Sequence, residues 1–302
     1  MRLDRARLRK NDQQGILPAL GALVVTSVLL LPGCGGGEES GGEPGPVIED
    51  PGPVHVHGLG INPRDGALFI ATHTGLFRAA PGEPKASRVG DRYQDTMGFS
   101  VVGPDRFLGS GHPDGRDDLP PFLGLIESRD AGASWEPVSL LGKADFHVLE
   151  AAGERVYGFG SDFDTREMLF LASSDGGKTW DERPVPEPLL SLDLHPDDPD
   201  RLTASGERDV YESDDGGRTW SPLDGSPGLL AWERASRLIT VTLAGEVMAG
   251  DGGAEAPRRV GEVGGEPAAF EAEDDGLYVA LHDGTVKRST NGGRSWTVRS
   301  RP

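Results

Sequence analysis

Short runs of alternating apolar and polar residues recur from about residue 54 to the end of the 302-residue chain. An apolar residue at every second position is typical of a half-buried β-strand, and no long run repeats with the 3.6-residue period of a helix. Glycine and proline, at 45 and 24 residues, separate these runs and favour tight turns. The pattern therefore predicts an all-β domain of many short strands.

Six of the runs align as one strand that repeats about every forty residues, and a second run follows each of them. Four short strands per repeat, arranged radially, protect their sheet edges in a β-propeller. The predicted first strands are 57–61, 98–102, 147–151, 190–194, 230–234 and 268–272, and the predicted second strands are 67–71, 106–110, 155–160, 201–205, 238–242 and 276–281.

Four segments of eight residues align without gaps after these runs, at 128–135, 173–180, 213–220 and 289–296. Each resembles the Asp-box, or BNR, motif Ser-x-Asp-x-Gly-x-Thr-Trp, so the chain is similar to Asp-box propellers of the sialidase-like and sortilin-like superfamily. Their starts lie 45, 40 and 76 residues apart, and the last spacing is about two periods. We therefore expect a six-bladed β-propeller in residues 54–302, with seven blades as the alternative count.

The Asp-box has a structural explanation. Its carboxylate accepts hydrogen bonds from amides of its own turn, the next glycine supplies a positive φ, and the tryptophan packs between strands. We therefore predict a structural role, and no catalytic one, for these side chains. They are Asp130, Asp175, Asp215, Asn291, Trp135, Trp180, Trp220 and Trp296.

Six of the seven histidines fall on one face of the predicted propeller. If the strands of a blade are lettered A to D from the axis outward, the D-to-A and B-to-C connections share one face, here called the top face. The Asp-boxes occupy C-to-D turns on the opposite, bottom face, where only His195 is expected. The histidines assigned to the top face are His55, His57, His73, His112, His147 and His282.

A metal or small-ligand site is predicted at the mouth of the central channel. His55 and His57 have the two-residue spacing that projects side chains to one side of a strand. The repeat alignment places His147 in the position of His57, and it places Asp145 in the position of His55. Imidazoles with the thioether of Met97 suit copper, and imidazoles with a carboxylate suit zinc.

The predicted ligands are therefore His55, His57 and His147. The side chains expected nearby are Met97, Asp145, His73, His112 and His282. The alternative is that these histidines only hydrogen-bond to neighbouring loops.

Two long B-to-C connections, 111–121 and 161–167, lie on the same predicted face. Long loops often carry function. Their carboxylates could hold calcium or a basic partner, or could form a solvated acidic rim. These acidic residues are Asp114, Asp117, Asp118, Asp162, Asp164 and Glu167.

The sequence favours a binding or scaffold module, with a glycoside hydrolase as the alternative. Resemblance to sialidases would imply an arginine triad, a tyrosine nucleophile paired with glutamate, and an aspartic acid. The chain lacks the Arg-Ile-Pro signature before its first box, and none of Tyr93, Tyr157, Tyr211 and Tyr278 matches the nucleophile. Non-enzymatic propellers resembling sortilin ectodomains and photosystem assembly factors carry the same boxes. The fold therefore does not decide between a binding module and a glycoside hydrolase.

The N-terminus has the layout of a secretion signal. A basic head precedes the apolar run 16–31, which is short for a membrane-spanning helix. The run ends in Leu31-Pro-Gly-Cys34, which resembles a bacterial lipobox, and Cys34 is the only cysteine. We therefore predict a signal peptide in 1–33, acylation of Cys34, a Gly/Pro/Glu-rich linker in 34–53, and an extracytoplasmic protein anchored to the cell membrane.

Removal of residues 1–33 takes away five positive and two negative charges, which changes the formal charge from −19 to −22. Such an acidic body repels nucleic acid and favours cations or basic proteins as partners. We expect a monomer whose partner is a polypeptide or a metal ion, with copper or zinc ahead of calcium.

Overall fold

The computed structural model describes residues 50–302 except residue 254. The predicted signal peptide, Cys34 and most of the linker lie outside this range. The described residues contain 24 strands and no helix, and none of their segments qualifies as a membrane-spanning helix. The all-β class is therefore confirmed.

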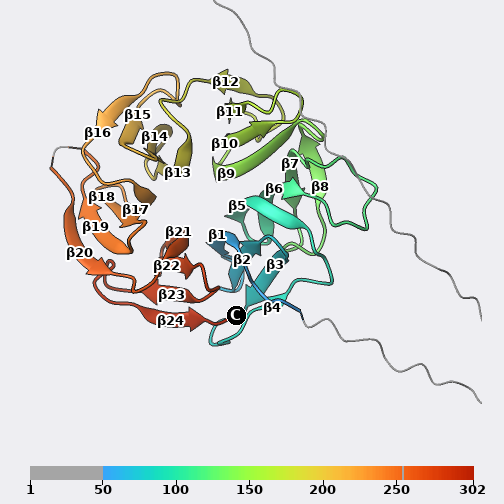
Figure 1. Ribbon diagram of the computed structural model, residues 1–302, viewed down its shortest axis with the longest axis horizontal. Helices are drawn as coiled ribbons and strands as arrows, with labels where there is room; N and C mark the ends of the chain where they lie inside the picture. Colours follow the sequence, from blue (N-terminus) through green and yellow to red (C-terminus); the bar gives the residue numbers. More distant parts are fainter. Residues whose placement is uncertain (1–49, 254) are drawn as a thin grey trace, which may run out of the picture. The chain divides into compact units, whose positions relative to one another are not determined.

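The strands form six four-stranded antiparallel sheets around a central axis (Figure 1). Each sheet consists of four consecutive strands, and its first strand contacts the first strands of both neighbouring sheets, including β1 against β21. The prediction of six blades is thus confirmed. Blades 1 to 3 contain β1 (Val56–Ile61), β2 (Leu68–Thr72), β3 (Gly75–Ala79), β4 (Ser87–Arg88), β5 (Asp95–Gly103), β6 (Arg106–His112), β7 (Leu125–Ser128), β8 (Glu136–Ser139), β9 (Ala144–Ala152), β10 (Arg155–Asp162), β11 (Met168–Ser173) and β12 (Asp181–Arg183). Blades 4 to 6 contain β13 (Leu189–His195), β14 (Asp198–Gly206), β15 (Val210–Ser213), β16 (Ser221–Leu223), β17 (Gly228–Arg234), β18 (Arg237–Thr242), β19 (Glu246–Gly250), β20 (Arg258–Glu262), β21 (Pro267–Glu273), β22 (Gly276–Leu281), β23 (Val286–Ser289) and β24 (Thr297–Ser300).

Two first strands begin three residues earlier than the sequence pattern indicated. β5 starts at Asp95 and not at residue 98, and β9 starts at Ala144 and not at residue 147. A β-bulge lies near the start of each strand, at Met97 in β5 and at His147 in β9. Such a bulge interrupts simple alternation, so the polar residues before it look like loop residues in the sequence.

The hydrophobic core is divided among the six interfaces between neighbouring blades. Between blades 1 and 2, for example, Phe69, Phe99 and Phe107 pack edge to face, with ring centroids 4.7 and 5.5 Å apart. Five further buried clusters each join one pair of adjacent blades, including blades 6 and 1. The blades are therefore held together mainly by apolar side chains, and the top and bottom faces remain free for polar groups.

The Asp-boxes lie in the turns between third and fourth strands, as predicted. In the third box, Oδ1 of Asp215 accepts hydrogen bonds from the N–H groups of Arg218 and Thr219 at 2.9 Å. Oδ2 accepts the Thr219 hydroxyl at 2.7 Å. Gly216 and Gly217 have φ values of 69° and 80°, which favour glycine. Ala131 takes the first of these positions in the first box with a φ of 58°, whereas the second position is glycine in all four boxes.

The fourth box keeps this geometry with an amide in place of the carboxylate. Oδ1 of Asn291 accepts the N–H of Ser295 at 3.0 Å, and its Nδ2 donates to the Ser295 hydroxyl at 2.8 Å. The hydrogen bonds of the turn therefore do not depend on a negative charge.

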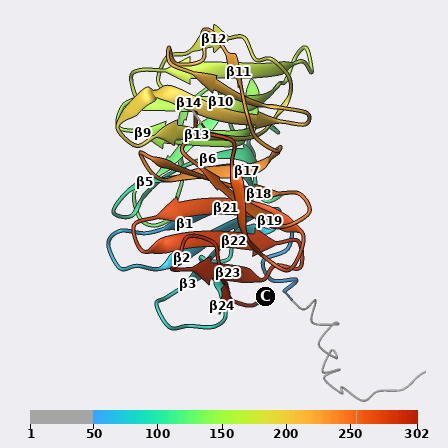
Figure 2. The same cartoon turned by 90° about the vertical axis from the view of Figure 1, so that its left-hand side faces the viewer.

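The ring closes without an exchanged strand, because blades 1 and 6 each have four strands of their own (Figures 1 and 2). The Arg299 guanidinium of β24 donates to the carbonyl groups of Ala79, Ala80 and Glu83 in blade 1 at 2.9–3.0 Å. Near the axis, Glu273 of β21 accepts the N–H of Ile61 at 2.8 Å. Closure thus combines the apolar core between blades 6 and 1 with a few charged hydrogen bonds.

Candidate functional site

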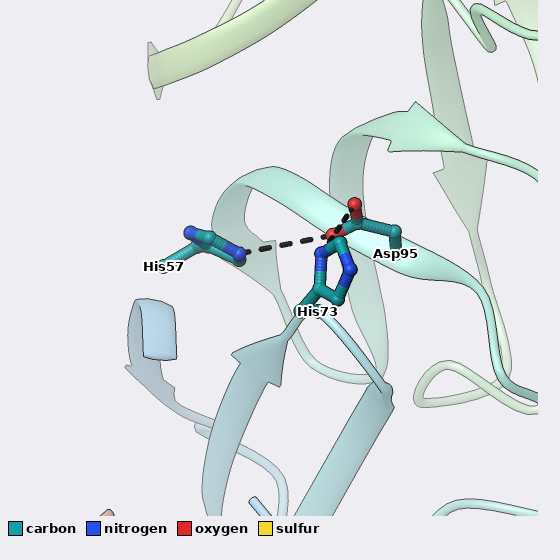
Figure 3. A group of neighbouring side chains, drawn as sticks. All are labelled: His57, His73 and Asp95. Carbon is teal, nitrogen blue, oxygen red and sulfur yellow. Dashed lines mark ion pairs between the residues drawn. The ribbon is translucent and has the colours of Figure 1, made fainter. Parts of the chain in front are cut away.

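Three side chains of types that can bind a metal converge where blades 1 and 2 meet (Figure 3). His57 belongs to β1, His73 follows β2 directly, and Asp95 is the first residue of β5. Nδ1 of His73 lies 2.8 Å from Oδ2 of Asp95, and Nε2 of His57 lies 3.7 Å from Oδ1. One ligand atom from each residue lies within 4.8 Å of the other two. We call His57, His73 and Asp95 the first triad.

Two atoms of the first triad are buried without a partner. Oδ1 of Asp95 and Nε2 of His57 have no hydrogen bond among the described residues, and Asp95 is only 7% exposed. Burial lowers the pKa of His57, against the opposing influence of Asp95, and so favours the neutral imidazole that binds metals. A buried oxygen with no donor is unfavourable, and a cation between these two atoms would satisfy both.

The donor set and the spacing fit a transition ion. Zinc accepts imidazole nitrogen and carboxylate oxygen ligands at about 2.0–2.2 Å, which places ligand atoms of a tetrahedral site about 3.4 Å apart. The two distances within the first triad, 2.8 and 3.7 Å, lie on either side of this value.

The polar network continues into blade 3. Nδ1 of His112 lies 3.2 Å from Oδ2 of Asp95, and Nε2 of the same ring lies 3.5 Å from Oδ2 of Asp145. Nε2 of His147 lies 3.1 Å from that same Asp145 oxygen. The hydrogen bond to Asp95 is the main cause that raises the pKa of His112. Four imidazoles and two carboxylates from three blades therefore form one continuous cluster.

Of the predicted ligands, the structure brings His57 and His147 into this cluster but leaves His55 at its margin. His55 is exposed, precedes β1 and has a φ of 53°, so the alternation of a strand does not apply to it. Its ring centroid lies 6.2 Å from that of His73. Metal binding by these residues stays a prediction.

The side chains expected near the predicted ligands also fall into two groups, those that belong to the cluster and those that do not. His73, His112 and Asp145 are members of the cluster. In residues 50–253 and 255–302, no hydrogen bond or ion pair joins the side chain of Met97 or His282 to it. The thioether that would have favoured copper thus makes no hydrogen bond to the imidazoles among the described residues.

Asp95 is a candidate ligand that the sequence pattern did not reveal. It precedes Met97 by two residues, as Asp145 precedes His147. The repeat alignment that paired Met97 with His147 would therefore have paired Asp95 with Asp145. The strand was assumed to begin at residue 98, and this placed Asp95 in a loop.

Carboxylates line the central channel beneath the cluster. Glu150 and Glu271 border the same cavity of about 90 Å³ as His57 and His147, and burial raises the pKa of both carboxyl groups well above the ordinary value. Deeper in the channel, burial raises the pKa of Asp193 to about 7. The channel thus presents protonated carboxyl groups at mildly acidic pH.

His195, the histidine predicted on the bottom face, is buried and makes contacts that stabilise the fold. It is 7% exposed, and its Nε2 lies 2.9 Å from the carbonyl oxygen of Ala235. Its ring packs edge-on against Trp232 at 4.7 Å. This side chain therefore anchors the turn between β17 and β18 to blade 4.

Several carboxylates of the long top-face loops form hydrogen bonds or ion pairs with their own loop or with the connection before β5. Asp114 accepts the N–H of Tyr93 at 2.8 Å and bonds to Arg116, while Asp117 pairs with Arg92. Asp162 accepts backbone N–H groups within its own turn. These three side chains order their loops, whereas the remaining three, Asp118, Asp164 and Glu167, are exposed.

Three of the four tyrosines have hydrogen-bonded partners in their own or a neighbouring blade. Tyr157 donates to Asp200, and Tyr278 donates to Asp275. Tyr211 donates to Glu187 at 3.1 Å, but it lies in β15, the third strand of its blade, and Glu187 also accepts a backbone N–H from Asp209. This tyrosine–glutamate pair therefore belongs to the loop before β15 and not to the channel.

Comparison with known proteins agrees with this fold. The model of the BNR/Asp-box repeat matches residues 211–222, which contain the third box. A gluconolactonase, XC5397 from Xanthomonas campestris, is 13% identical, with coverage of 76% of this chain and 84% of that chain and a TM-score of 0.59. A chain of a nidogen/laminin complex is 11% identical, with coverage of 78% and 93% and a TM-score of 0.61.

YCF48 bound to D1 peptide is 16% identical, with coverage of 68% of each chain and a TM-score of 0.46. A search of curated protein sequences found no match. Identities this low show the fold alone. The protein is therefore a six-bladed β-propeller that carries BNR/Asp-box repeats, and its function has to be argued from its own side chains.

Proposed function

We propose that this protein is an extracytoplasmic binding propeller, anchored by a lipid on Cys34, that holds a divalent transition ion through the first triad. The observation that carries the proposal is the buried pair of partnerless atoms, Oδ1 of Asp95 and Nε2 of His57, which face each other across 3.7 Å. A metal ion between them would satisfy both atoms at once. The lipobox-like sequence before Cys34 supports the anchor.

The donor set favours zinc, with Cu(II) as the other candidate. Two imidazoles and one carboxylate form a mixed nitrogen and oxygen set that both ions accept. Cu(II) binds most such sites more tightly than zinc does, so availability outside the cell decides which ion occupies the site. The strongly negative formal charge of the chain would attract cations to this site.

The glycosidase alternative has one observation in its favour, the carboxylates Glu150 and Glu271 in the channel. Glycosidases need two such groups on either side of a sugar ring. They line two cavities of the channel, one with His57 and His147 of about 90 Å³ and a second of about 210 Å³, whereas organic ligand sites usually measure about 300–1,000 Å³. A space of this size suits an ion with a few water molecules better than a sugar.

Isothermal titration with Zn(II) and Cu(II) tests the proposal. The protein should carry Cys34→Ser and no polyhistidine tag, so that neither a thiol nor a tag binds metal. We expect a dissociation constant of about 1 μM or lower. His73→Ala should weaken zinc binding at least tenfold without unfolding the chain, because the His73 side chain is 61% exposed.

His282→Ala is the matched control, since His282 is another exposed top-face histidine next to a second strand. Its affinity should equal that of the parent. Absence of binding, or equal loss in both variants, contradicts the proposal. Hydrolysis of fluorogenic glycosides by the metal-free protein would favour the glycosidase instead.

A further inference from the structure

A groove with a largely apolar lining lies on the side of blade 2 that faces blade 1. Phe107 and Gly109 of β6 share this side of the sheet, because the ring of Phe107 packs against Phe69 of blade 1. Ile126 of β7 pairs with Gly109. The groove has a volume of about 210 Å³, and its apolar lining includes Leu119, Leu123, Ile126, Trp135 and Pro137.

The groove lies beside the shortest outer strand of the propeller. β4 of blade 1 has two residues, whereas the outer strands of the other blades have three to five. In blades 3 and 4, the preceding outer strand supplies an acceptor for the tryptophan of the Asp-box. The indole N–H of Trp180 donates to the Ser139 hydroxyl of β8, and that of Trp220 donates to the carbonyl of Pro184 after β12, both at 2.9 Å.

The equivalent tryptophan of blade 2 has no such acceptor. Trp135 borders the groove, and its indole N–H makes no hydrogen bond within residues 50–253 and 255–302. The unpartnered nitrogen of Trp296 in the fourth box is buried, whereas that of Trp135 is accessible. A chain segment that enters the groove can therefore accept the Trp135 N–H, as the preceding blade does for Trp180 and Trp220.

A buried amide provides a second unused contact in the same groove. Gln94 lines the groove and is 6% exposed. Its side chain has one hydrogen bond among the described residues, a long one of 3.4 Å from Nε2 to the Thr96 hydroxyl. A primary amide accepts hydrogen bonds as well as donating them. Gln94 and Trp135 thus offer an acceptor and a donor, which complement the N–H and C=O groups of an extended polypeptide backbone.

The charges around the groove favour a basic partner. The only ionic pair in the lining, Arg92 with Asp117, is neutral as a pair. Asp118 and Glu136 are exposed and adjoin lining residues in the sequence, and neither has an ion pair in the described part of the chain. The formal charge of the whole chain is −19. Lysine or arginine next to an apolar residue therefore complements this surface.

We propose that the groove binds an extended segment of a partner polypeptide in which basic residues flank an apolar one. The apolar side chain lies against Leu119, Ile126 and Trp135, and the backbone bonds to Gln94 and to the Trp135 indole. The groove is smaller than the sites of about 300–1,000 Å³ that take drug-sized molecules, and its size fits the side chains of a peptide. This inference goes beyond the proposed function and does not depend on a bound metal.

Selection from a phage library of short random peptides, with the Cys34→Ser protein as target, tests the inference. We expect the selected sequences to share an apolar residue between lysines or arginines. Synthetic copies with a fluorescent label are then titrated with variants. Leu119→Asn should weaken binding about fivefold or more, because it removes apolar contact area. The side chain is 43% exposed, so the melting temperature should not change.

Leu243→Asn is the matched control. Leu243 is 56% exposed and lies in the turn between β18 and β19 of blade 5, away from the groove. Its variant should bind the peptides as the parent does.

The indole N–H signals of the five tryptophans give a direct readout by nuclear magnetic resonance. The Trp135 signal, identified by its absence in Trp135→Phe, should shift when peptide is added. The Trp220 signal, identified in the same way, should not shift, because its N–H already donates to Pro184.

Three outcomes overturn the inference. The selection enriches no sequence of the expected kind, or Leu119→Asn binds the peptides as tightly as the parent. The third outcome is a dimer of the parent in sedimentation that becomes a monomer in Leu119→Asn, because the groove would then belong to a second copy of the chain. His73→Ala should lose the metal and keep the peptide, so the proposed function and this inference can fail separately.

Discussion

Asp95 shows how much the chemistry of this propeller depends on single atoms. Its Oδ2 contacts Nδ1 of His73 at 2.8 Å and Nδ1 of His112 at 3.2 Å, whereas Oδ1 has no hydrogen bond among the described residues. The Asp-box carboxylates are the opposite case, because Asp215 receives hydrogen bonds on both oxygens from its own turn. These bonds hold the pKa of Asp215 at about 2. Aspartate side chains thus accept the hydrogen bonds of turns on the bottom face, whereas on the top face they are candidate metal ligands.

The comparison of two Asp215 variants tests the structural role of the boxes. Asp215→Ala removes the acceptor for Arg218 and Thr219, and it should lower the melting temperature by about 2–4 °C, equivalent to about 1 kcal/mol. Asp215→Asn should change it much less, because Asn291 makes the same turn in the fourth box. Thermal unfolding followed by circular dichroism measures both. Equal destabilisation by the two substitutions would show that charge, and not turn geometry, is what the box requires.

At the scale of elements, the positions of the cluster's side chains are determined by the ends of strands. Asp95 and His112 are the paired ends of β5 and β6, so their positions depend on the close approach of these two strands. Gly111 permits this approach, because its φ is 136° and a Cβ there would lie 2.2 Å from the carbonyl oxygen of Asp95. A glycine is therefore needed where the two strands carry the polar side chains.

Gly111→Ala should damage the site more than the fold. The added methyl group must push β5 away from β6, which moves Asp95 relative to His73 and His112. We expect at least tenfold weaker zinc binding, measured by titration, and a melting temperature lower by several degrees. Gly115→Ala in the same connection is the control, since nothing lies within 4 Å of its Cβ position. Unchanged zinc affinity in Gly111→Ala would mean that this strand pair does not position the site.

At the scale of the whole molecule, ring closure brings acidic groups together around the axis. Glu150, Asp193, Glu271 and Glu273 come from blades 3, 4 and 6 and border the channel. Burial is the main cause that raises the pKa of Glu273 to about 7, although the Ile61 N–H opposes it. Each of these groups stabilises the fold better when protonated than when ionised.

The stability of the propeller should therefore fall as pH rises. The folded-state pKa of Glu273, about 7, exceeds the ordinary glutamate value of 4.5, so its contribution is fully present below pH 4.5 and is lost as pH passes through 7. Glu273→Gln keeps an acceptor for Ile61 and cannot ionise. We expect it to stabilise the protein at pH 8 by about 1–3 kcal/mol and to have little effect at pH 5.

Urea unfolding at pH 5, 6, 7 and 8 measures this difference between Glu273→Gln and the parent. The control is Glu136→Gln, which changes an exposed glutamate in β8. Its unfolding free energy should differ from that of the parent by the same amount at every pH. If the unfolding free energy of Glu273→Gln also follows that of the parent at every pH, folding does not raise the pKa of Glu273.

The sequence by itself determined the repeat. Strand alternation and the Asp-boxes are local patterns, because turn hydrogen bonds and the two-residue period of a strand involve neighbouring residues only. They indicated the all-β class, six blades with seven as the alternative, and the top-face placement of His57, His73, His112 and His147. The same local reasoning failed at His55, where a left-handed residue replaced the expected strand.

Only the tertiary structure decided which of these side chains meet. Asp95 contacts His73 and His112 because neighbouring blades pack together and a bulge brings the start of β5 into the sheet. The raised pKa values in the channel likewise depend on burial that exists only after the ring has closed. Contacts between residues far apart in sequence, and the loss of water around them, have no local signature, so a sequence pattern does not specify them.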